Sequence, residues 1–410
     1  MGHLVVAGSY EGGLHGWRLD GASEAATLAF SFGAHDGCTR CVATTGFGGT
    51  VLSGGDDEKI RVYSLKSRKQ VGELSQHTGT VTALTFCGAK HAVSASGDGT
   101  LLVWRMRGWD CVHVLGGHKG PVLSLAPHPS GRMVLSTGVD RTLRLWDLTE
   151  GRVAFITRTK GEALKAFWSS DGSCYGVVLK GKVEVRDVED NAVLTEIDVG
   201  SAVLDAHFLD DAPFVATCDG TGAVSVFSVD DGDLVWRRKR KAPTTPGRVK
   251  ALACLRLGAG GAGDDDDRYA SADADALREW ASSRALLAAT SSGTVETWRP
   301  GDGDADDDAD APASVASGVS ARLTCLAASA AADDGPPEST TPAPPEAPRP
   351  KATNKATTKA TTKATNGGAK ARSPAPAKRA APPAAATTKR DLKAKLKRVK
   401  RARANSLSSN

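Results

Sequence analysis

The chain has 410 residues and a net charge of only +5, but this charge is unevenly distributed. Residues 349–410 contain eleven lysines and seven arginines against a single acid, a net charge of +17 that leaves −12 for the first 348 residues. No apolar run approaches the roughly 18 residues of a membrane span, and the first residues lack the basic and apolar regions of a signal peptide. These features exclude a membrane protein, and we expect a soluble, intracellular chain with an acidic body and a basic tail.

The cysteines form no recognisable metal or disulfide pattern. They are scattered along the chain as Cys38, Cys41, Cys87, Cys111, Cys174, Cys218, Cys254 and Cys325. The one close pair, Cys38 and Cys41, has neither a second pair nor a histidine at zinc-finger spacing. Residues three apart in a strand point to opposite faces, which disfavours a shared metal or a redox pair. We interpret the cysteines as small buried hydrophobes and expect no metal and no cofactor.

An internal repeat is the strongest signal in the chain. Residues 53–63, 94–104 and 136–146 align without gaps, and each segment follows a histidine. The histidine precedes an aspartate by 22, 21 and 22 residues, and an aromatic residue follows that aspartate six residues later. The unit recurs every 41 to 42 residues, and the third one ends in Trp146-Asp147. This period and ending are typical of the four-stranded blades of a WD-repeat β-propeller.

The recurring polar residues have a structural interpretation. A buried histidine, a turn aspartate, a serine and a strand aromatic residue can form one hydrogen-bonded chain that satisfies buried polar groups and fixes the strand register. The three sets are His35, Ser53, Asp57 and Tyr63; His77, Ser94, Asp98 and Trp104; and His118, Ser136, Asp140 and Trp146. The same residue types also make a Ser-His-Asp triad, but catalysis needs one site and a scaffold needs many. We therefore predict no catalytic residue and no enzyme.

Three weaker units follow the good ones, and strand-like alternation identifies them. Residues 163–187 keep the strand pattern without a turn aspartate, and residues 203–227 have Thr221 where that aspartate would be. Residues 249–298 form another unit that an insertion interrupts. Six blades are thereby accounted for.

The seventh blade is predicted to be split between the two ends of the folded region. Residues 3–33 supply three strands, and the missing innermost strand is predicted at residues 321–327. Their pairing closes the ring and removes two exposed sheet edges, which would otherwise favour aggregation. We expect an all-β fold, a seven-bladed propeller over residues 1–330 that its N- and C-terminal strands close.

Two aspartate-rich insertions, at residues 258–276 and 300–312, fall outside the blade pattern. They contain few apolar residues, so we predict solvated loops on one rim of the propeller. A calcium site is the alternative. Neither segment has the order of acidic residues that an EF-hand loop needs, and the loop interpretation is favoured.

The tail changes composition completely. Residues 331–388, rich in Pro, Ala, Lys and Thr, are predicted to be a disordered linker. In residues 389–404, Leu392, Leu396 and Val399 fall on one narrow helical face. The cations around that face are Lys389, Arg390, Lys393, Lys395, Lys397, Arg398, Lys400, Arg401 and Arg403. We predict that they bind nucleic-acid phosphates and direct nuclear or nucleolar localisation; an anionic membrane surface and a purely solubilising role are the disfavoured alternatives.

Longer blocks carry a more specific resemblance than the generic repeat. They are residues 5–17, 117–147, 150–156 and 321–326, together with the degenerate fifth blade and the Lys-rich C-terminus. In this order the chain resembles the PAK-interacting WD-repeat proteins, whose fungal counterparts are Mak-type factors for making the large ribosomal subunit. The acidic insertions and the Lys-Ala-Thr repeats of the tail depart from that pattern.

The resemblance implies a nucleolar protein that joins precursors of the large ribosomal subunit and, in animals, inhibits a p21-activated kinase (PAK). Our first hypothesis is a scaffold in the nucleus and nucleolus, monomeric within a larger complex. In it the propeller docks on pre-ribosomal proteins of the large subunit and the tail holds pre-rRNA. The second hypothesis is a cytoplasmic adaptor that binds and negatively regulates a PAK-type kinase. A third, a propeller enzyme, lacks a unique catalytic cluster.

Overall fold

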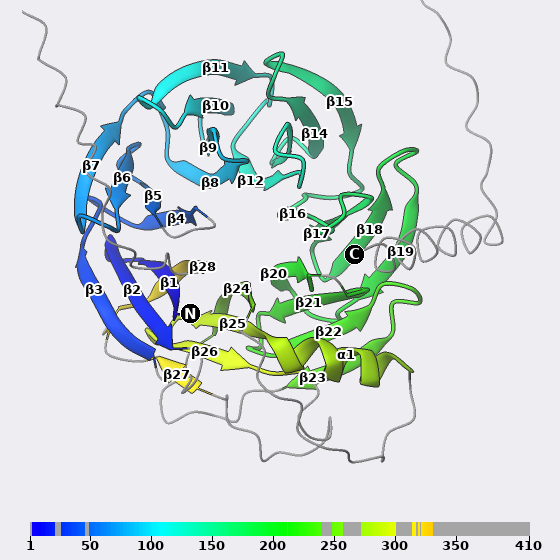
Figure 1. The fold of residues 1–410 in the computed structure, drawn as a ribbon. Coiled ribbons are helices and arrows are strands. Elements are labelled where there is room, and N and C mark those ends of the chain that lie inside the picture. Colours follow the sequence, from blue (N-terminus) through cyan, green and yellow to red (C-terminus); the bar gives the residue numbers. More distant parts are fainter. Residues whose placement is uncertain are drawn as a thin grey trace, which may run out of the picture. The chain divides into compact units, whose positions relative to one another are not determined.

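The alternating segments of the sequence form short antiparallel strands in seven four-stranded sheets, which are arranged as blades around a central axis (Figure 1). This computed structural model describes residues 2–20, 26–45, 49–210, 212–238, 248–256, 272–300, 314–316, 319 and 321–330. The prediction of an all-β, seven-bladed propeller is confirmed. Within the described segments, no helix is long and apolar enough to cross a membrane.

The blades are numbered here from the N-terminus, and each runs from its innermost to its outermost strand. Blade 1 contains β28 (Leu323–Ala330), β1 (Gly2–Ser9), β2 (Gly13–Asp20) and β3 (Ala26–Gly33). Blade 2 contains β4 (Thr39–Thr44), β5 (Thr50–Gly55), β6 (Ile60–Ser64) and β7 (Lys69–Leu74). Blade 3 contains β8 (Val81–Cys87), β9 (His91–Ser96), β10 (Thr100–Arg105) and β11 (Asp110–Gly116).

Blade 4 contains β12 (Val122–Pro127), β13 (Met133–Gly138), β14 (Thr142–Asp147) and β15 (Arg152–Arg158). Blade 5 contains β16 (Lys165–Trp168), β17 (Cys174–Leu179), β18 (Lys182–Asp187) and β19 (Val193–Asp198). Blade 6 contains β20 (Val203–Phe208), β21 (Phe214–Asp219), β22 (Val224–Ser228) and β23 (Leu234–Arg238). Blade 7 contains β24 (Val249–Arg256), the helix α1 (Ala272–Ser283), β25 (Arg284–Thr290), β26 (Val295–Trp298) and β27 (Ser314–Ala316).

The hydrophobic core lies between the blades. Leu52 of blade 2, for example, belongs to one buried cluster with Val81, Leu102 and Trp104 of blade 3. A middle strand is covered on both faces by neighbouring blades, which is why β21 is buried at every position. An outermost strand such as β15 has one free edge and is mostly exposed. Each blade therefore depends on two neighbours to bury its apolar residues.

The antiparallel order places two kinds of segment at the same end of the propeller. Successive strands reverse direction, so the connections from one blade to the next meet the turns between the second and third strands of each blade. Backbone hydrogen bonds join them, as from Val139 N to Pro121 O at 3.0 Å and from Gly97 N to Thr80 O at 2.9 Å. We call this end of the propeller the connection face.

The ring closes through β28 and β1, as the sequence predicted. Val6 pairs with Ala327 and Gly8 with Cys325 in an antiparallel register. The paired strand runs from residue 323 to 330, so the predicted range of 321–327 began two residues early. A Cβ at Gly8 would lie 2.6 Å from Cγ2 of Thr39 in blade 2, which explains why a glycine stands at this contact.

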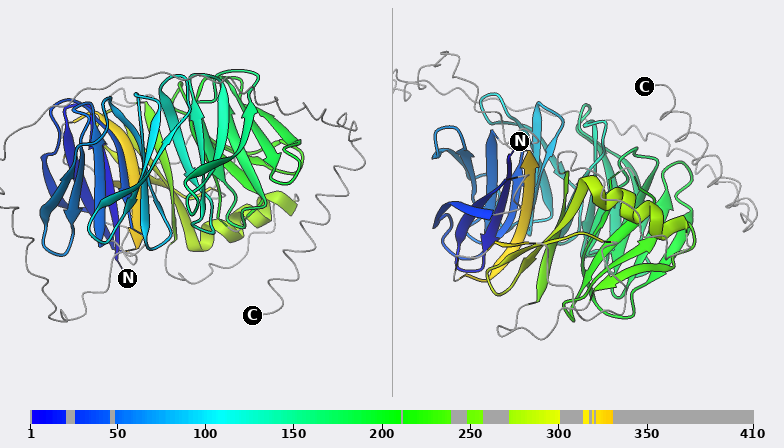
Figure 2. Two further views of the ribbon diagram at one scale, coloured as in Figure 1. Left: turned by 90° about the horizontal axis from the view of Figure 1, so that it is seen from above. Right: turned by 60° about the horizontal axis from the view of Figure 1, so that its bottom comes forward.

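The predicted loop at residues 258–276 is partly wrong, because its last five residues belong to α1. Leu277, Trp280 and Ala281 lie at i, i+3 and i+4 and are buried against blades 6 and 7. Trp280 Nε1 also donates a hydrogen bond to the carbonyl of Asp210 at 3.0 Å. Because α1 joins β24 to β25, it lies at the end opposite the connection face (Figure 2). Residues 258–271 and 301–312 are outside the described part of the chain.

Removal of β28 tests the closure. Deleting residues 323–330 should expose the β1 edge and the apolar residues that Leu323 covers, so we expect insoluble protein or loss of cooperative thermal unfolding. Deletion of residues 349–410 is the matched control and should leave the unfolding transition unchanged. A β28 deletion that melts like the parent in differential scanning calorimetry would contradict closure by this strand.

Candidate functional site

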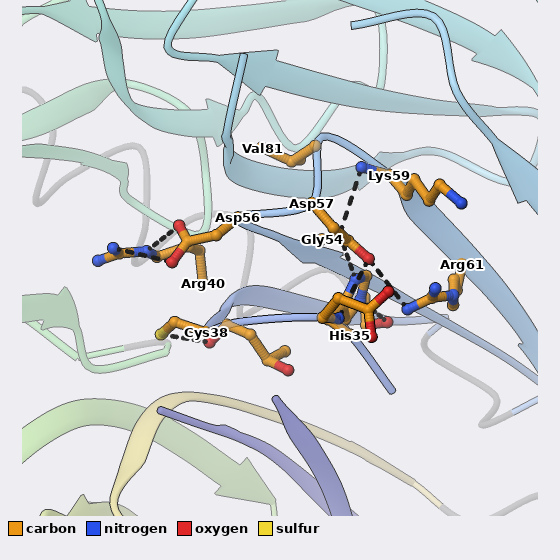
Figure 3. Close-up of polar contacts among 12 residues, drawn as sticks. His35, Cys38, Arg40, Gly54, Asp56, Asp57, Lys59, Arg61 and Val81 are labelled. Carbon is orange, nitrogen blue, oxygen red and sulfur yellow. Dashed lines mark hydrogen bonds and ion pairs between the residues drawn. The ribbon is translucent and has the colours of Figure 1, made fainter. Parts of the chain in front are cut away.

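The polar set of blade 2 is assembled at the connection face from three segments of chain (Figure 3). His35 lies in the connection between β3 and β4, and its Nδ1 is 2.7 Å from Oδ1 of Asp57 in the β5–β6 turn. Its Nε2 is 2.7 Å from Oγ of Ser53 in β5. Arg61 also contacts Asp57 at 3.2 Å. Tyr63, the aromatic member of the set, is buried in β6.

Blades 3 and 4 contain complete four-residue chains. His77 bonds Asp98 at 3.2 Å and Ser94 at 2.8 Å, and Trp104 Nε1 donates to Ser94 Oγ at 2.9 Å. In blade 4 the corresponding distances are 3.1 Å from His118 to Asp140, 2.7 Å from His118 to Ser136 and 2.8 Å from Trp146 to Ser136. The structure thus brings together the residues of each set.

A threonine that the sequence analysis overlooked completes each aspartate. Thr142 Oγ1 donates to Asp140 at 2.7 Å, and Thr100 Oγ1 donates to Asp98 at 2.6 Å. Both threonines stand two residues after the aspartate, a spacing visible in the sequence. The neighbouring glycine leaves room for the imidazole, because a Cβ at Gly138 would lie 2.5 Å from Nδ1 of His118.

Burial sets the charge state of the network. It lowers the pKa of His118 below 6.5, and the hydrogen bond from Asp140 only partly offsets this effect. Burial alone would raise the pKa of Asp140, but hydrogen bonds from the Lys119 N–H, Thr142 and His118 hold it at about 2. The pair is therefore a neutral imidazole bonded to a carboxylate at neutral pH.

The arrangement does not suit nucleophilic catalysis. Ser53, Ser94 and Ser136 have no exposed surface, so no substrate can reach their hydroxyls. In blades 3 and 4 the same oxygen already bonds a histidine and a tryptophan. These serines hold strands in register, as buried polar groups with full partners do.

The other blades keep only parts of this network. Trp17 and Trp298 occupy the tryptophan position of blades 1 and 7, but Ala7 and Ala288 replace the serine in the paired strand. The Nε1 atoms of both tryptophans are buried without a hydrogen-bond partner in the described chain. Sequence divergence in these blades has therefore removed an acceptor while keeping the large apolar side chain.

Blade 6 uses an aspartate that the sequence analysis missed. Asp219 stands two residues before Thr221, at the position of Gly138 in blade 4. Its carboxylate accepts hydrogen bonds from Ser201 Oγ at 2.7 Å, Thr221 Oγ1 at 2.5 Å and the Ala223 N–H at 3.0 Å. The sequence places Val199 at the histidine position of this blade, so the carboxylate lies where an imidazole would otherwise be.

The cysteines show no metal or disulfide chemistry in the described residues. All eight are free, and no group of three His, Cys, Asp or Glu side chains in the described segments could hold a metal ion. Burial raises the pKa of the Cys87 thiol to about 12, which disfavours the reactive thiolate. The predicted nucleic-acid-binding cations at residues 389–403 lie outside the described residues.

Comparison with known proteins follows from this geometry. The "WD domain, G-beta repeat" family matches residues 26–64, 68–105 and 109–147. Each match spans the outermost strand of one blade and the three inner strands of the next. The chain is 31% identical over 326 residues to a "p21-activated protein kinase-interacting protein 1-like" protein of Xenopus laevis, covering 79% of this chain and 81% of the relative. The chain belongs to the p21-activated protein kinase-interacting protein 1 family.

Two further family members extend the comparison. The zebrafish protein of the same name is 35% identical over 248 residues, which are 60% of this chain and 66% of the relative. "Protein MAK11" of Saccharomyces cerevisiae is 30% identical over 223 residues, which are 47% of this chain and 53% of the relative. The family resemblance inferred from the sequence is therefore confirmed.

Substitution of Asp140 tests the structural role of the network. Asp140→Ala leaves the His118 imidazole and the Thr142 hydroxyl without their acceptor, so we expect a loss of about 1–3 kcal/mol in the free energy of unfolding. Urea denaturation measures it, and substitution of the exposed Glu189 by alanine is the control. Unchanged stability together with loss of a specific activity would contradict a structural role.

The same network predicts a pH dependence of stability. The folded state lowers the pKa of His118 below 6.5 and that of Asp140 to about 2, so it binds fewer protons than the unfolded chain below pH 6.5. Stability should therefore fall as the pH drops below about 6.5, and further below about 4, where unfolded aspartates take up protons. Urea midpoints at pH 7.5, 5.5 and 4.5 measure the fall, which His118→Gln should reduce. A midpoint that stays constant over this range would argue against the neutral-imidazole assignment.

Proposed function

We propose that this chain is a non-enzymatic scaffold for assembly of the large ribosomal subunit, in the nucleolus. In this role the propeller binds pre-ribosomal proteins and the basic tail holds pre-rRNA. The observation that carries the proposal is the combination, in a member of this family, of a WD-repeat propeller with a tail of net charge +17.

The propeller supports the scaffold part of the proposal. Its most enzyme-like residue sets recur in three consecutive blades with their serines enclosed, so they stabilise the blades. The loops and turns at both ends of the strands remain free to contact partners, as on other rigid scaffolds. Fold alone does not identify the partner, and the ribosomal assignment comes from the family resemblance.

The tail supports the RNA part of the proposal through its composition. Residues 349–410 contain eighteen cations, one acid and no aromatic residue. Cations release counterions from phosphates without reading bases, whereas sequence-tolerant stacking needs aromatic side chains. We therefore infer binding to single-stranded or structured RNA with little sequence preference.

A second candidate function is binding and restraint of a PAK-type kinase. The printed names of the Xenopus and zebrafish relatives, which describe kinase-interacting proteins, favour it. The two candidates differ in location and in what co-purifies. A fluorescent fusion concentrated in nucleoli, with pre-rRNA and large-subunit proteins in its affinity purification, supports the scaffold, whereas a diffuse cytosolic fusion that co-purifies a kinase supports the adaptor.

Deletion of residues 349–410 tests the tail. Full-length protein should bind RNA with a log–log salt slope near −5 to −6 if about eight cations engage phosphates, since each contact contributes about −0.7 on single strands. The truncated protein should lose RNA binding and nucleolar retention while its propeller stays folded. Fluorescence anisotropy with a labelled single-stranded RNA at several salt concentrations measures the slope.

A partial variant provides the matched control. Replacing Lys351, Lys355, Lys359 and Lys363 by glutamine removes four charges from the Lys-Ala-Thr repeats and leaves residues 389–404 intact. The slope should become shallower by at most about 3. RNA binding and nucleolar enrichment that survive complete tail deletion would move the RNA site to the propeller.

A further inference from the structure

One irregular position recurs at the start of the innermost strands, at the connection face. A β-bulge there places one extra residue between the first two paired residues, as at Leu123 in β12 and Leu204 in β20. In blade 5, Leu164 immediately precedes β16, and its N–H bonds the carbonyl of Val178 at 2.9 Å. The same bulge in blades 2 and 7 carries Arg40 and Lys250.

Three consecutive blades therefore present a leucine at the mouth of the ring. Leu164 is 39% exposed and Leu204 is 37% exposed, and Leu123 is partly exposed. Their strands β12, β16 and β20 lie side by side around the axis (Figure 1). Single exposed leucines need no explanation, but a repeated apolar position on adjacent blades marks a candidate interaction surface. We call Leu123, Leu164 and Leu204 the leucine arc.

Polar contacts hold the strands of the leucine arc together. Lys165 Nζ forms an ion pair with Asp205 of the next blade and lies 2.8 Å from His207 Nε2. Burial and the nearby Lys165 lower the pKa of His207 to about 4, so its neutral ring can accept this hydrogen bond. The other carboxylate oxygen of Asp205 accepts the Leu252 N–H at 2.9 Å. A surface fixed in this way loses little conformational entropy when a partner binds.

Exposed cations border the leucine arc on blades 4 and 5. They are Lys119, Arg141, Lys160 and Lys180, from two blade connections and two turns of the connection face. Lys160 lies 3.7 Å from the buried Glu184, whereas the other three have no ion-pair partner within the described chain. Glu162 and Asp198 are exposed acids on the same blades, so the border keeps an excess of positive charge.

The opposite sign occupies the matching positions of blade 2. The backbone N–H groups of Lys119 and Asp36 both bond the turn aspartate of their blade, which identifies them as equivalent positions. Arg141 and Glu58 are likewise equivalent and share a left-handed backbone, with φ of 58° and 64°. The connection face is therefore basic at blade 4 and acidic at blade 2, so a charged ligand would be attracted to only one side of it.

We propose that the connection face of blades 4 to 6 binds an acidic peptide segment of a partner protein. Two or three large apolar side chains of that segment contact the leucine arc, and its carboxylates contact Lys119, Arg141 and Lys180. The leucines favour a protein ligand over RNA, because backbone phosphates offer nothing apolar to bury. The chain's own tail is excluded by its positive charge. This inference rests on the proposed scaffold function and specifies the chemistry of its protein partner.

Peptide selection tests the inference without a known partner. Full-length protein is presented to a phage library of random dodecapeptides, and the retained sequences are read. We expect enrichment of Asp and Glu together with Leu, Ile and Phe. The best peptide is then synthesised with a fluorescent label, and its affinity is measured by anisotropy.

Matched variants locate the binding surface. Leu164→Ser with Leu204→Ser, and Lys119→Glu with Arg141→Glu, should each weaken the peptide by roughly tenfold or more, as loss of interface anchors does. The controls are Leu28→Ser with Leu234→Ser, on outermost strands, and Lys90→Glu with Arg107→Glu, at the opposite end of the strands; both should leave the affinity unchanged. Thermal unfolding verifies that each variant is folded.

The outcomes separate this inference from the proposed function. Retained peptides without acidic and apolar enrichment would overturn the inference, as would equal binding by both arc variants. Binding of poly-uridine RNA that both arc variants abolish would identify an RNA surface and also overturn it. Peptide binding that persists after deletion of residues 349–410, in a protein that never enters nucleoli, would sustain the peptide site while rejecting the ribosomal role.

Discussion

The fold depends on the backbone pairing between β28 and β1. These segments lie more than 300 residues apart in the sequence, yet they form adjacent strands of blade 1. Each blade buries its apolar residues against two neighbours, so an open ring would leave two blade faces and one strand edge exposed to water. The arrangement of every other blade follows from meeting this condition, since seven sheets of similar width must return to their starting point.

The hydrogen-bonded sets of blades 2 to 4 solve a second problem, which is how to bury polar groups without cost. A neutral imidazole bridges a carboxylate at the surface to a serine in the core, so each group has a partner. Blades 1 and 7 keep the tryptophan but replace the serine by alanine, and blade 6 replaces the imidazole by a carboxylate. The propeller thus combines three regular blades with four irregular ones, and the leucine arc lies mainly on the irregular side.

The sequence alone predicted the features that repeat and missed those that occur once. Period and spacing located the blades because each requires the same residues at the same distances. Helix α1 was missed because acidic residues at its start hid the apolar spacing of Leu277 and Trp280. Asp219 was missed because it lies two residues before the expected position, where only the vacated histidine space admits a carboxylate. The leucine arc was invisible because its bulges break strand alternation and its members are about 40 residues apart.

Closure by the last strand also has a consequence for biosynthesis. Strand β1 is among the first segments to leave the ribosome, while its partner β28 is made only after residue 323. At roughly 5–20 residues per second, the N-terminal edge waits on the order of 15–65 seconds for that partner. During this interval the nascent chain presents an unpaired strand with buried-type residues such as Val5 and Val6. Safe production of this protein therefore requires that the nascent N-terminus be shielded until translation of the propeller is complete.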